Sequence, residues 1–213
     1  NDSALGAGIH ITYTSNPIIQ KNQIIGNTAG GLGGGGIYVY YQSEPLIAYN
    51  LITQNISTNG AGIGIYYESN VVIHNNLIIN NLSGAGIRLN GTVSAAINHN
   101  TISGNVAGIE CASIDTVTID NNIITSNGNK YGISASTNLP AIHYNNVWQH
   151  GAGNYNTTIG EQTGINGNIS EDPAFQAAGD YRLNFTSPCI NAGYPNFAAD
   201  PEDIDYFGNP RVL

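Results

Sequence analysis

GIECASIDTVTIDNNIITSN, residues 108–127, is one copy of a unit that recurs six times along this chain of 213 residues. Each copy begins with a Gly-Ile pair and carries an asparagine, in the frame N-x-(I/V), twelve or thirteen residues after the isoleucine. The pairs are Gly8-Ile9, Gly36-Ile37, Gly62-Ile63, Gly86-Ile87, Gly108-Ile109 and Gly132-Ile133. The asparagines are Asn22, Asn50, Asn76, Asn100, Asn122 and Asn145. Successive copies lie 22 to 28 residues apart, and such a period without helical spacing predicts a solenoid of stacked units.

Five apolar positions recur in every unit and predict its strands. In residues 108–127 they are Ile109, Cys111, Val117, Ile119 and Ile124. Alternation over short runs of β-branched residues, broken by Gly and Asn, predicts three short strands per unit. Because each strand would pair with its equivalent one unit away, the sequence predicts an all-β parallel β-helix of about six to seven turns.

The recurring asparagine is expected at the sharp turn between the second and third strands, because Asn tolerates the left-handed backbone conformation. Stacked amides also hydrogen-bond from one turn to the next in asparagine ladders, so we expect a structural role. A second asparagine, five residues later, is expected to open the loop that returns to the next Gly-Ile pair. It occurs at Asn27, Asn55, Asn81, Asn105 and Asn127, with His150 in the last unit.

The repeat resembles the right-handed parallel β-helix repeats of the pectate-lyase-like superfamily over residues 1–150. Residues 151–213 resemble the closing segment common in secreted bacterial and archaeal members. The matching strings are DPAF (172–175), GDYRL (179–183), SPCINAG (187–193) and GNPR (208–211). The resemblance implies a right-handed β-helix over 1–150 and an irregular C-terminal cap over 151–213, within one domain. This architecture carries many activities, so it gives no function by itself.

The composition limits the partners. Asp and Glu supply 14 residues against five Lys and Arg, which gives a net charge of -9, and asparagine supplies 31 residues. This balance argues against a nucleic-acid partner and makes a polyanionic substrate unfavourable without a bridging cation. No apolar run is long enough for membrane insertion. Low charge, high Asn, Ser and Thr content and the resemblance together predict an extracellular or cell-surface location.

Alternation along the first strand of each unit points a second set of residues outward. This outward set contains His10, Tyr38, Tyr40, Tyr66, Arg88 and Glu110, with Tyr67 just beyond its strand. Equivalent residues lie about 4.8 Å apart across turns, so they form a continuous surface. Tyrosine faces stack on sugar C–H groups and polar groups bind hydroxyls, so the sequence predicts glycan binding by these seven residues. The alternative is that the tyrosines stack only to stabilise the sheet.

Catalysis on this face would rest on Arg88 and Glu110. A lyase needs a base and a cation that neutralises a uronate, whereas a glycosidase needs two carboxylates about 5 to 9.5 Å apart. Arg88 is the one outward cation of this column, and Glu110 lies one turn later. The two residues are therefore candidate catalytic groups, and the alternative is a structural ion pair between them.

Other candidate sites carry weaker patterns. The acidic residues Asp203 and Asp205 are candidate calcium ligands, because hard cations prefer several oxygen donors. No other cofactor is expected. The glycine run at 30–36 precedes no helix, so we expect a flexible return loop rather than a phosphate site. Cys111 and Cys189 are expected to be buried free thiols.

Two functions remain open from the sequence. The first is a non-catalytic extracellular β-helical module for structure or adhesion that binds a glycan through the tyrosine face. Bare strand edges at one end would also allow a second copy to stack end to end, as in a filament. The alternative is a polysaccharide lyase or glycoside hydrolase acting in the same groove.

Overall fold

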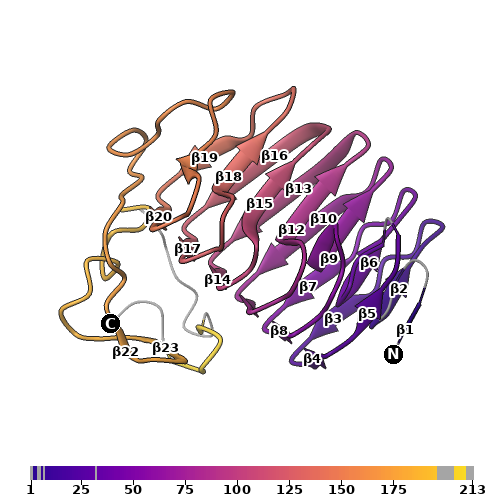
Figure 1. Cartoon of the computed structure of the whole chain (residues 1–213), viewed down its shortest axis with the longest axis horizontal. Coiled ribbons are helices and arrows are strands. Elements are labelled where there is room, and N and C mark those ends of the chain that lie inside the picture. The colour runs from indigo at the N-terminus through magenta and orange to yellow at the C-terminus, as the bar shows by residue number, and fades with distance from the viewer. Residues whose placement is uncertain (1, 4–5, 7, 32, 196–203, 210–213) are drawn as a thin grey trace.

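The computed structural model describes residues 2–3, 6, 8–31, 33–195 and 204–209. The described chain contains strands, turns and loops, and each turn adds one strand to each of three parallel sheets (Figure 1). The first strand and the C-terminal tail lie at opposite ends of the stack. The expectation of an all-β parallel β-helix with three short strands per turn is confirmed.

The three sheets correspond to the three strands of the repeat. The first sheet contains β2 (Ile9–Ile11), β6 (Ile37–Val39), β9 (Gly60–Tyr66), β12 (Ala85–Asn90), β15 (Ala107–Cys111), β18 (Tyr131–Ala135) and β21 (Gly153–Tyr155). The second sheet contains β3 (Ile18–Gln20), β7 (Leu46–Ala48), β10 (Asn70–His74), β13 (Val93–Asn98), β16 (Ile114–Asp120) and β19 (Ala141–His143). The third sheet contains β4 (Gln23–Ile25), β8 (Leu51–Thr53), β11 (Leu77–Ile79), β14 (Thr101–Ser103), β17 (Ile123–Thr125) and β20 (Asn146–Trp148). Outside them, β1 (Asp2–Ser3) pairs with β5 (Thr28–Ala29), and β22 (Phe175–Ala177) forms an antiparallel hairpin with β23 (Asp180–Leu183).

The core is a set of aliphatic stacks. In-register pairing places Ile37 on Ile63, Ile63 on Ile87 and Ile87 on Ile109, and all four side chains are fully buried. Full burial of one such side chain contributes about 1.5–3 kcal/mol, so these stacks are the main stabilising element of the rod.

The glycine of each Gly-Ile pair is required by packing. A Cβ atom added to Gly62 would overlap the Gly86 carbonyl oxygen and lie 2.8 Å from Cγ2 of Ile78. At Gly86 the added atom would lie 2.8 Å from Cγ2 of Ile102 and 3.0 Å from Nδ2 of Asn105. At these positions, the first sheet comes too close to the third-sheet isoleucines and to the next turn for a side chain to fit.

The recurring asparagines form a hydrogen-bonded ladder between the second and third sheets. The backbone N and Nδ2 of Asn50 both donate to Oδ1 of Asn76, at 2.9 and 3.0 Å. Asn76 in turn donates through Nδ2 to Oδ1 of Asn100 (3.0 Å) and to the Ile47 carbonyl (2.8 Å). This pattern confirms the predicted structural role of these residues.

The prediction that the ladder asparagines have a left-handed backbone is wrong by one residue. The residue before each ladder asparagine is left-handed, with φ near 56°: Lys21, Tyr49, Asn75, His99, Asn121 and Tyr144. This preceding residue makes the bend, so the asparagine side chain can turn inward and connect neighbouring turns.

The second asparagine of each unit forms a ladder of its own, which the sequence did not predict. Asn81 donates through Nδ2 to Oδ1 of Asn105, and Asn105 does the same to Asn127, both at 3.0 Å. His150 occupies the next position, where its Nε2 lies 3.0 Å from the Ile124 carbonyl, as Asn127 Nδ2 does from the Ile102 carbonyl at 3.1 Å. Its buried Nδ1 has no hydrogen-bond partner in the described part of the chain.

We expect His150→Asn to stabilise the protein and to reduce its sensitivity to acid. Burial lowers the pKa of His150, so the folded state favours the neutral ring more than the unfolded state does. The stability that depends on neutral His150 is therefore complete above about pH 6.5 and declines as the pH falls below it. An asparagine would also accept a ladder bond from Asn127, worth about 1 kcal/mol.

Urea unfolding at mildly alkaline and mildly acidic pH measures this difference. The exposed His10→Asn serves as the control for replacing a histidine outside the core. A profile for His150→Asn that runs parallel to the unmodified one would contradict the role of the buried ring.

The β-helix continues beyond residue 150, where the sequence repeat ends. Strand β21 pairs with β18, and Ile169 makes a parallel bridge to Asn146. Asn145 donates through Nδ2 to Oδ1 of Asn168 at 3.1 Å, and Asn168 donates to the Ile142 and Ile165 carbonyls. Residues 156–171 thus form an irregular further turn that covers this end of the rod.

Candidate functional site

Two of the tyrosines expected to face solvent are buried. Tyr38 and Tyr66 point outward from the first sheet, yet only 3% and 4% of their surfaces are exposed. The glycine-rich segments before the Gly-Ile pairs fold over this face, and a Cβ atom added to Gly34 would lie 3.0 Å from the backbone N of Gly64. The prediction that Tyr38 and Tyr66 contact a ligand directly from an open face is therefore wrong. Residues 33–36, expected in a flexible return loop, are buried and form part of this cover.

The buried tyrosines form an aromatic cluster with their neighbours. The Tyr38 ring lies 5.0 Å from that of His10, 5.3 Å from that of Tyr66 and 5.8 Å from that of Tyr40. Burial, with a smaller contribution from neighbouring tyrosines, raises the pKa of Tyr38 to about 12. Tilted and stacked contacts of this kind stabilise by about 0.5–1.5 kcal/mol each, so part of the tyrosine face supports the sheet.

The exposed tyrosines lie one or two residues beyond the first-sheet strands β2, β6 and β9, where the chain turns toward the second sheet. Tyr13, Tyr41 and Tyr67 occupy the same place in successive turns and are 71%, 43% and 53% exposed. Tyr40 joins them, with its ring 6.2 Å from that of Tyr41 and 5.0 Å from that of Tyr67. We call Tyr13, Tyr40, Tyr41 and Tyr67 the tyrosine strip. Tyr13 was not predicted as a ligand-binding residue, although it follows its Gly-Ile pair at the same distance along the chain as Tyr41 and Tyr67 do.

The backbone of the strip is strained. Tyr13, Tyr41 and Tyr67 have φ of 56°, 52° and 50°, and the residue after each is also left-handed. The fourth turn has Gly91 at this position, the residue type that adopts the conformation at least cost. A bulky residue there costs about 1–2 kcal/mol, so the three tyrosines are present despite an unfavourable backbone.

Buried serines hold these strained turns in place. Ser43 donates through Oγ to the Tyr40 carbonyl (3.0 Å), and Ser69 donates to the Tyr66 carbonyl (2.9 Å). The serines also connect turns, because the backbone N of Ser43 donates to Oγ of Ser69 at 3.4 Å. Next to the strip, Nε2 of Gln42 donates to Oε2 of Glu68 at 2.9 Å. The strip is therefore a set of rings on a fixed support.

Arg88 and Glu110 form the structural ion pair that was the alternative to a catalytic role. Nη1 of Arg88 lies 2.6 Å from Oε2 of Glu110, and Nζ of Lys130 lies 3.0 Å from Oε1 of the same carboxylate. Lys130 was not predicted as a partner of Glu110, because it lies in the loop before its Gly-Ile pair. Burial raises the pKa of Tyr66, and the cation of Arg88 opposes that rise. Both carboxylate oxygens of Glu110 are thus engaged by cations.

The candidate calcium ligands and one further pair of ionisable groups are placed as follows. Asp203 lies outside the described residues, and the carboxylate of Asp205 accepts hydrogen bonds from the backbone N and Nδ2 of Asn209 at 2.8 and 3.0 Å. Nδ1 of His143 pairs with Oδ1 of Asp120 at 2.8 Å. Among the described residues, no group of three His, Cys, Asp or Glu side chains is arranged to hold a metal ion. Calcium binding by Asp203 and Asp205 stays a prediction.

Both cysteines are free. Cys111 is buried in the first-sheet stack, and Cys189 is partly buried, with its Sγ 3.0 Å from Nδ2 of Asn146. Burial raises the pKa of the Cys111 thiol to about 12 and also raises that of Cys189. Thiols with a raised pKa stay protonated at neutral pH and are therefore poor nucleophiles.

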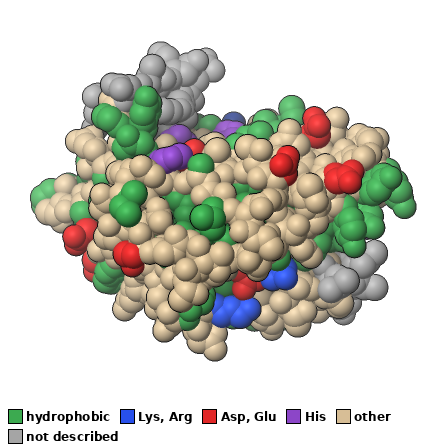
Figure 2. All heavy atoms as spheres, turned by 90° about the horizontal axis from the view of Figure 1, so that it is seen from above, with side chains coloured by type: hydrophobic (Ala, Val, Ile, Leu, Met, Phe, Trp, Pro, Cys, Tyr) green, Lys and Arg blue, Asp and Glu red, His purple; other side chains and the backbone are tan. Residues whose placement is uncertain are grey.

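The surface matches the low charge of the sequence. Figure 2 shows a face covered mainly by uncharged polar side chains and backbone, with separate acidic groups and a small group of histidines. No helix in the described part of the chain is long and apolar enough to span a membrane.

Comparison with known families agrees with this architecture. A family model described as "Right handed beta helix region" matches residues 2–170. The chain belongs to this right-handed β-helix family. The match ends one residue after Ile169, which makes the last bridge of the β-helix. No curated protein and no solved structure gives a significant match, so the function of this β-helix is argued from its own geometry.

Proposed function

We propose that this β-helix is a non-catalytic extracellular module that binds neutral glycan chains through the tyrosine strip. The observation that carries the proposal is the alignment of the exposed Tyr13, Tyr41 and Tyr67 side chains. Three exposed aromatic rings occupy a left-handed backbone position at the same place in successive turns. The left-handed turn recurs at the ladder positions, including Tyr49, so the exposure of three aligned rings supports the proposal rather than the backbone conformation alone.

The spacing of the strip suits a chain ligand. Equivalent residues of neighbouring turns are about 4.8 Å apart, close to the length of one sugar residue in a polysaccharide. The rings offer flat apolar faces, while Gln42 and Glu68 beside them can bind hydroxyl groups. The net charge of -9 disfavours an acidic polysaccharide, so we propose a neutral one.

We expect Tyr41→Asn and Tyr67→Asn each to weaken binding of a neutral oligosaccharide about tenfold, the effect of losing about 1.4 kcal/mol of ring contact. Asparagine tolerates the left-handed backbone, so the unfolding midpoint should stay within a few degrees of the unmodified protein. Isothermal titration with cello-, manno- and xylo-oligosaccharides measures the affinity.

The matched control is Tyr49→Asn, because Tyr49 is also left-handed but lies at the turn between the second and third sheets. This variant should bind as the unmodified protein does. Absence of binding to all the neutral oligosaccharides, or equal affinity of the Tyr41, Tyr67 and Tyr49 variants, would contradict the proposed function.

No specific observation favours the catalytic alternative on this face. A lyase or hydrolase would need a carboxylate or a cation free to reach the substrate, whereas Glu110 is held by Arg88 and Lys130. End-to-end assembly stays a prediction for the edge formed by β2, β3 and β4.

A further inference from the structure

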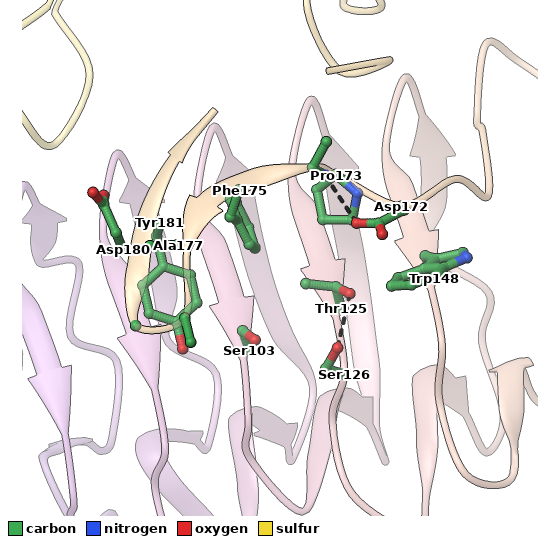
Figure 3. A pocket seen from close by; sticks show the side chains of 13 residues that line it. Ser103, Thr125, Ser126, Trp148, Asp172, Pro173, Phe175, Ala177, Asp180 and Tyr181 are labelled. Carbon is green, nitrogen blue, oxygen red and sulfur yellow. Dashed lines mark hydrogen bonds between the residues drawn. The ribbon is translucent and has the colours of Figure 1, made fainter. Parts of the chain in front are cut away.

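A separate cavity lies between the third sheet and the C-terminal hairpin (Figure 3). It has a volume of about 340 Å³, within the range of small-molecule sites. Thr125 and Trp148 form part of its floor on the outer face of the third sheet, and Phe175 and Tyr181 of the hairpin form part of its roof.

The cavity is held open by contacts that fix the tail to the rod. Nδ2 of Asn146 donates to the Glu171 carbonyl at 2.8 Å, and the backbone N of Glu171 donates back to Oδ1 of Asn146 at 3.0 Å. Oγ of Ser187 donates to the Pro173 carbonyl at 2.6 Å. In the hairpin, the rings of Phe175 and Tyr181 lie 5.1 Å apart in an edge contact. The roof is thus positioned before any ligand enters.

The lining combines hydrogen-bonding groups with aromatic rings. Ser103 and Thr125 lie in the lining and are 5% and 2% exposed. Oγ1 of Thr125 lies 3.2 Å from Oγ of Ser126, and Asp172 uses only Oδ1, which accepts from the backbone N of Ala174 at 2.9 Å. Oδ2 of Asp172 is therefore left to bind a polar ligand beside the rings of Trp148 and Phe175, with the hydroxyls of Ser103 and Thr125 in the same lining.

We propose that this cavity is a second saccharide site, which takes one or two residues of a neutral sugar. Sugar rings present both C–H faces for aromatic rings and hydroxyl groups for Ser103, Thr125 and Asp172. An anionic sugar is disfavoured by the Asp172 carboxylate, because the described lining contains no Lys or Arg and the second lining carboxylate, Asp180, is already paired with Arg182. The site is independent of the tyrosine strip, since it is built on the third sheet and the tail.

The protein carries its own reporter for this site, because Trp148 is its only tryptophan. We expect cellobiose, maltose or lactose to change Trp148 fluorescence in a saturable way, and digalacturonate to leave it unchanged. Thr125→Val removes one hydroxyl and keeps the shape of the side chain, and Asp172→Asn removes the charge and keeps the bond to Ala174. Each variant should weaken the fluorescence response about fivefold in midpoint.

Thr53→Val is the matched control, because Thr53 occupies the same outward column of the third sheet but lies outside the cavity. This variant should respond as the unmodified protein does, and so should Tyr41→Asn and Tyr67→Asn. A Trp148 response that persists in those two strip variants supports this site even if glycan binding by the strip fails. No saturable response to any of the neutral disaccharides, an equal response to digalacturonate, or unchanged midpoints in both Thr125→Val and Asp172→Asn would overturn the proposal.

Discussion

Gly62→Ala is expected to destabilise the β-helix by about 3 kcal/mol or to prevent folding, although it adds a single methyl group. The added Cβ atom would overlap the Gly86 carbonyl oxygen of the next turn and lie 2.8 Å from Cγ2 of Ile78. Neither neighbour can withdraw, because the carbonyl belongs to the first-sheet backbone and Ile78 is fully buried. Urea unfolding, with the free energy extrapolated to water, measures the loss.

Gly128→Ala separates this packing effect from the general cost of replacing glycine. Gly128 has no left-handed backbone, and an added Cβ would lie 3.2 Å from the Val106 carbonyl oxygen and 3.3 Å from the Asn105 carbonyl oxygen, closer than ordinary contact but without the overlap found at Gly62. We expect a change of less than about 1 kcal/mol. Equal stability of the Gly62 and Gly128 variants would show that the Gly-Ile pair is not fixed by contact between turns.

Asn76→Asp is expected to cost about 3–5 kcal/mol at neutral pH, although the side chain keeps its shape. Asn76 donates through Nδ2 to Ile47, His74 and Asn100 acceptors. An aspartate would place a buried negative charge against these three oxygens with no cation to compensate it. Urea unfolding at several pH values measures the cost.

The pH dependence gives this substitution a specific signature. Burial beside acceptors raises the pKa of such a carboxyl in the folded state, so protonation favours folding. The penalty should therefore be largest above the raised pKa and shrink as the pH falls toward about 4, the ordinary value of an aspartate. Asn70→Asp, at an exposed position of β10, should change stability by less than about 0.5 kcal/mol. A penalty in Asn76→Asp that does not depend on pH would contradict the ladder account.

The scaffold could be predicted from the sequence because the repeat uses Gly, Ile and Asn at positions where few other residues fit. The Ile63, Ile87 and Ile109 register follows from the Gly-Ile spacing, and the structure pairs these residues directly. The second ladder was missed because Asn81 and Asn105 follow the strand and read as loop residues. Asn168 was missed because its 23-residue spacing from Asn145 continues the ladder without a Gly-Ile pair.

The surface could be predicted only in part. Alternation gives the direction in which Tyr38 and Tyr66 point, but not that the glycine segments near Gly34 and Gly60 fold over them. The ion pair of Arg88 and Glu110 could be predicted from their shared column, and it is confirmed. The cavity at Trp148 could not be predicted from the sequence, because it depends on where the tail at Phe175 returns to the third sheet.

The central claim is that the β-helix presents the tyrosine strip as a binding surface for neutral glycan. A crystal structure of the protein with a neutral oligosaccharide selected by titration tests it most directly. We predict successive sugar rings stacked on the exposed faces of Tyr41 and Tyr67, with the chain running along the rod. An oligosaccharide bound elsewhere, with the rings of Tyr41 and Tyr67 free of contact, would contradict the claim.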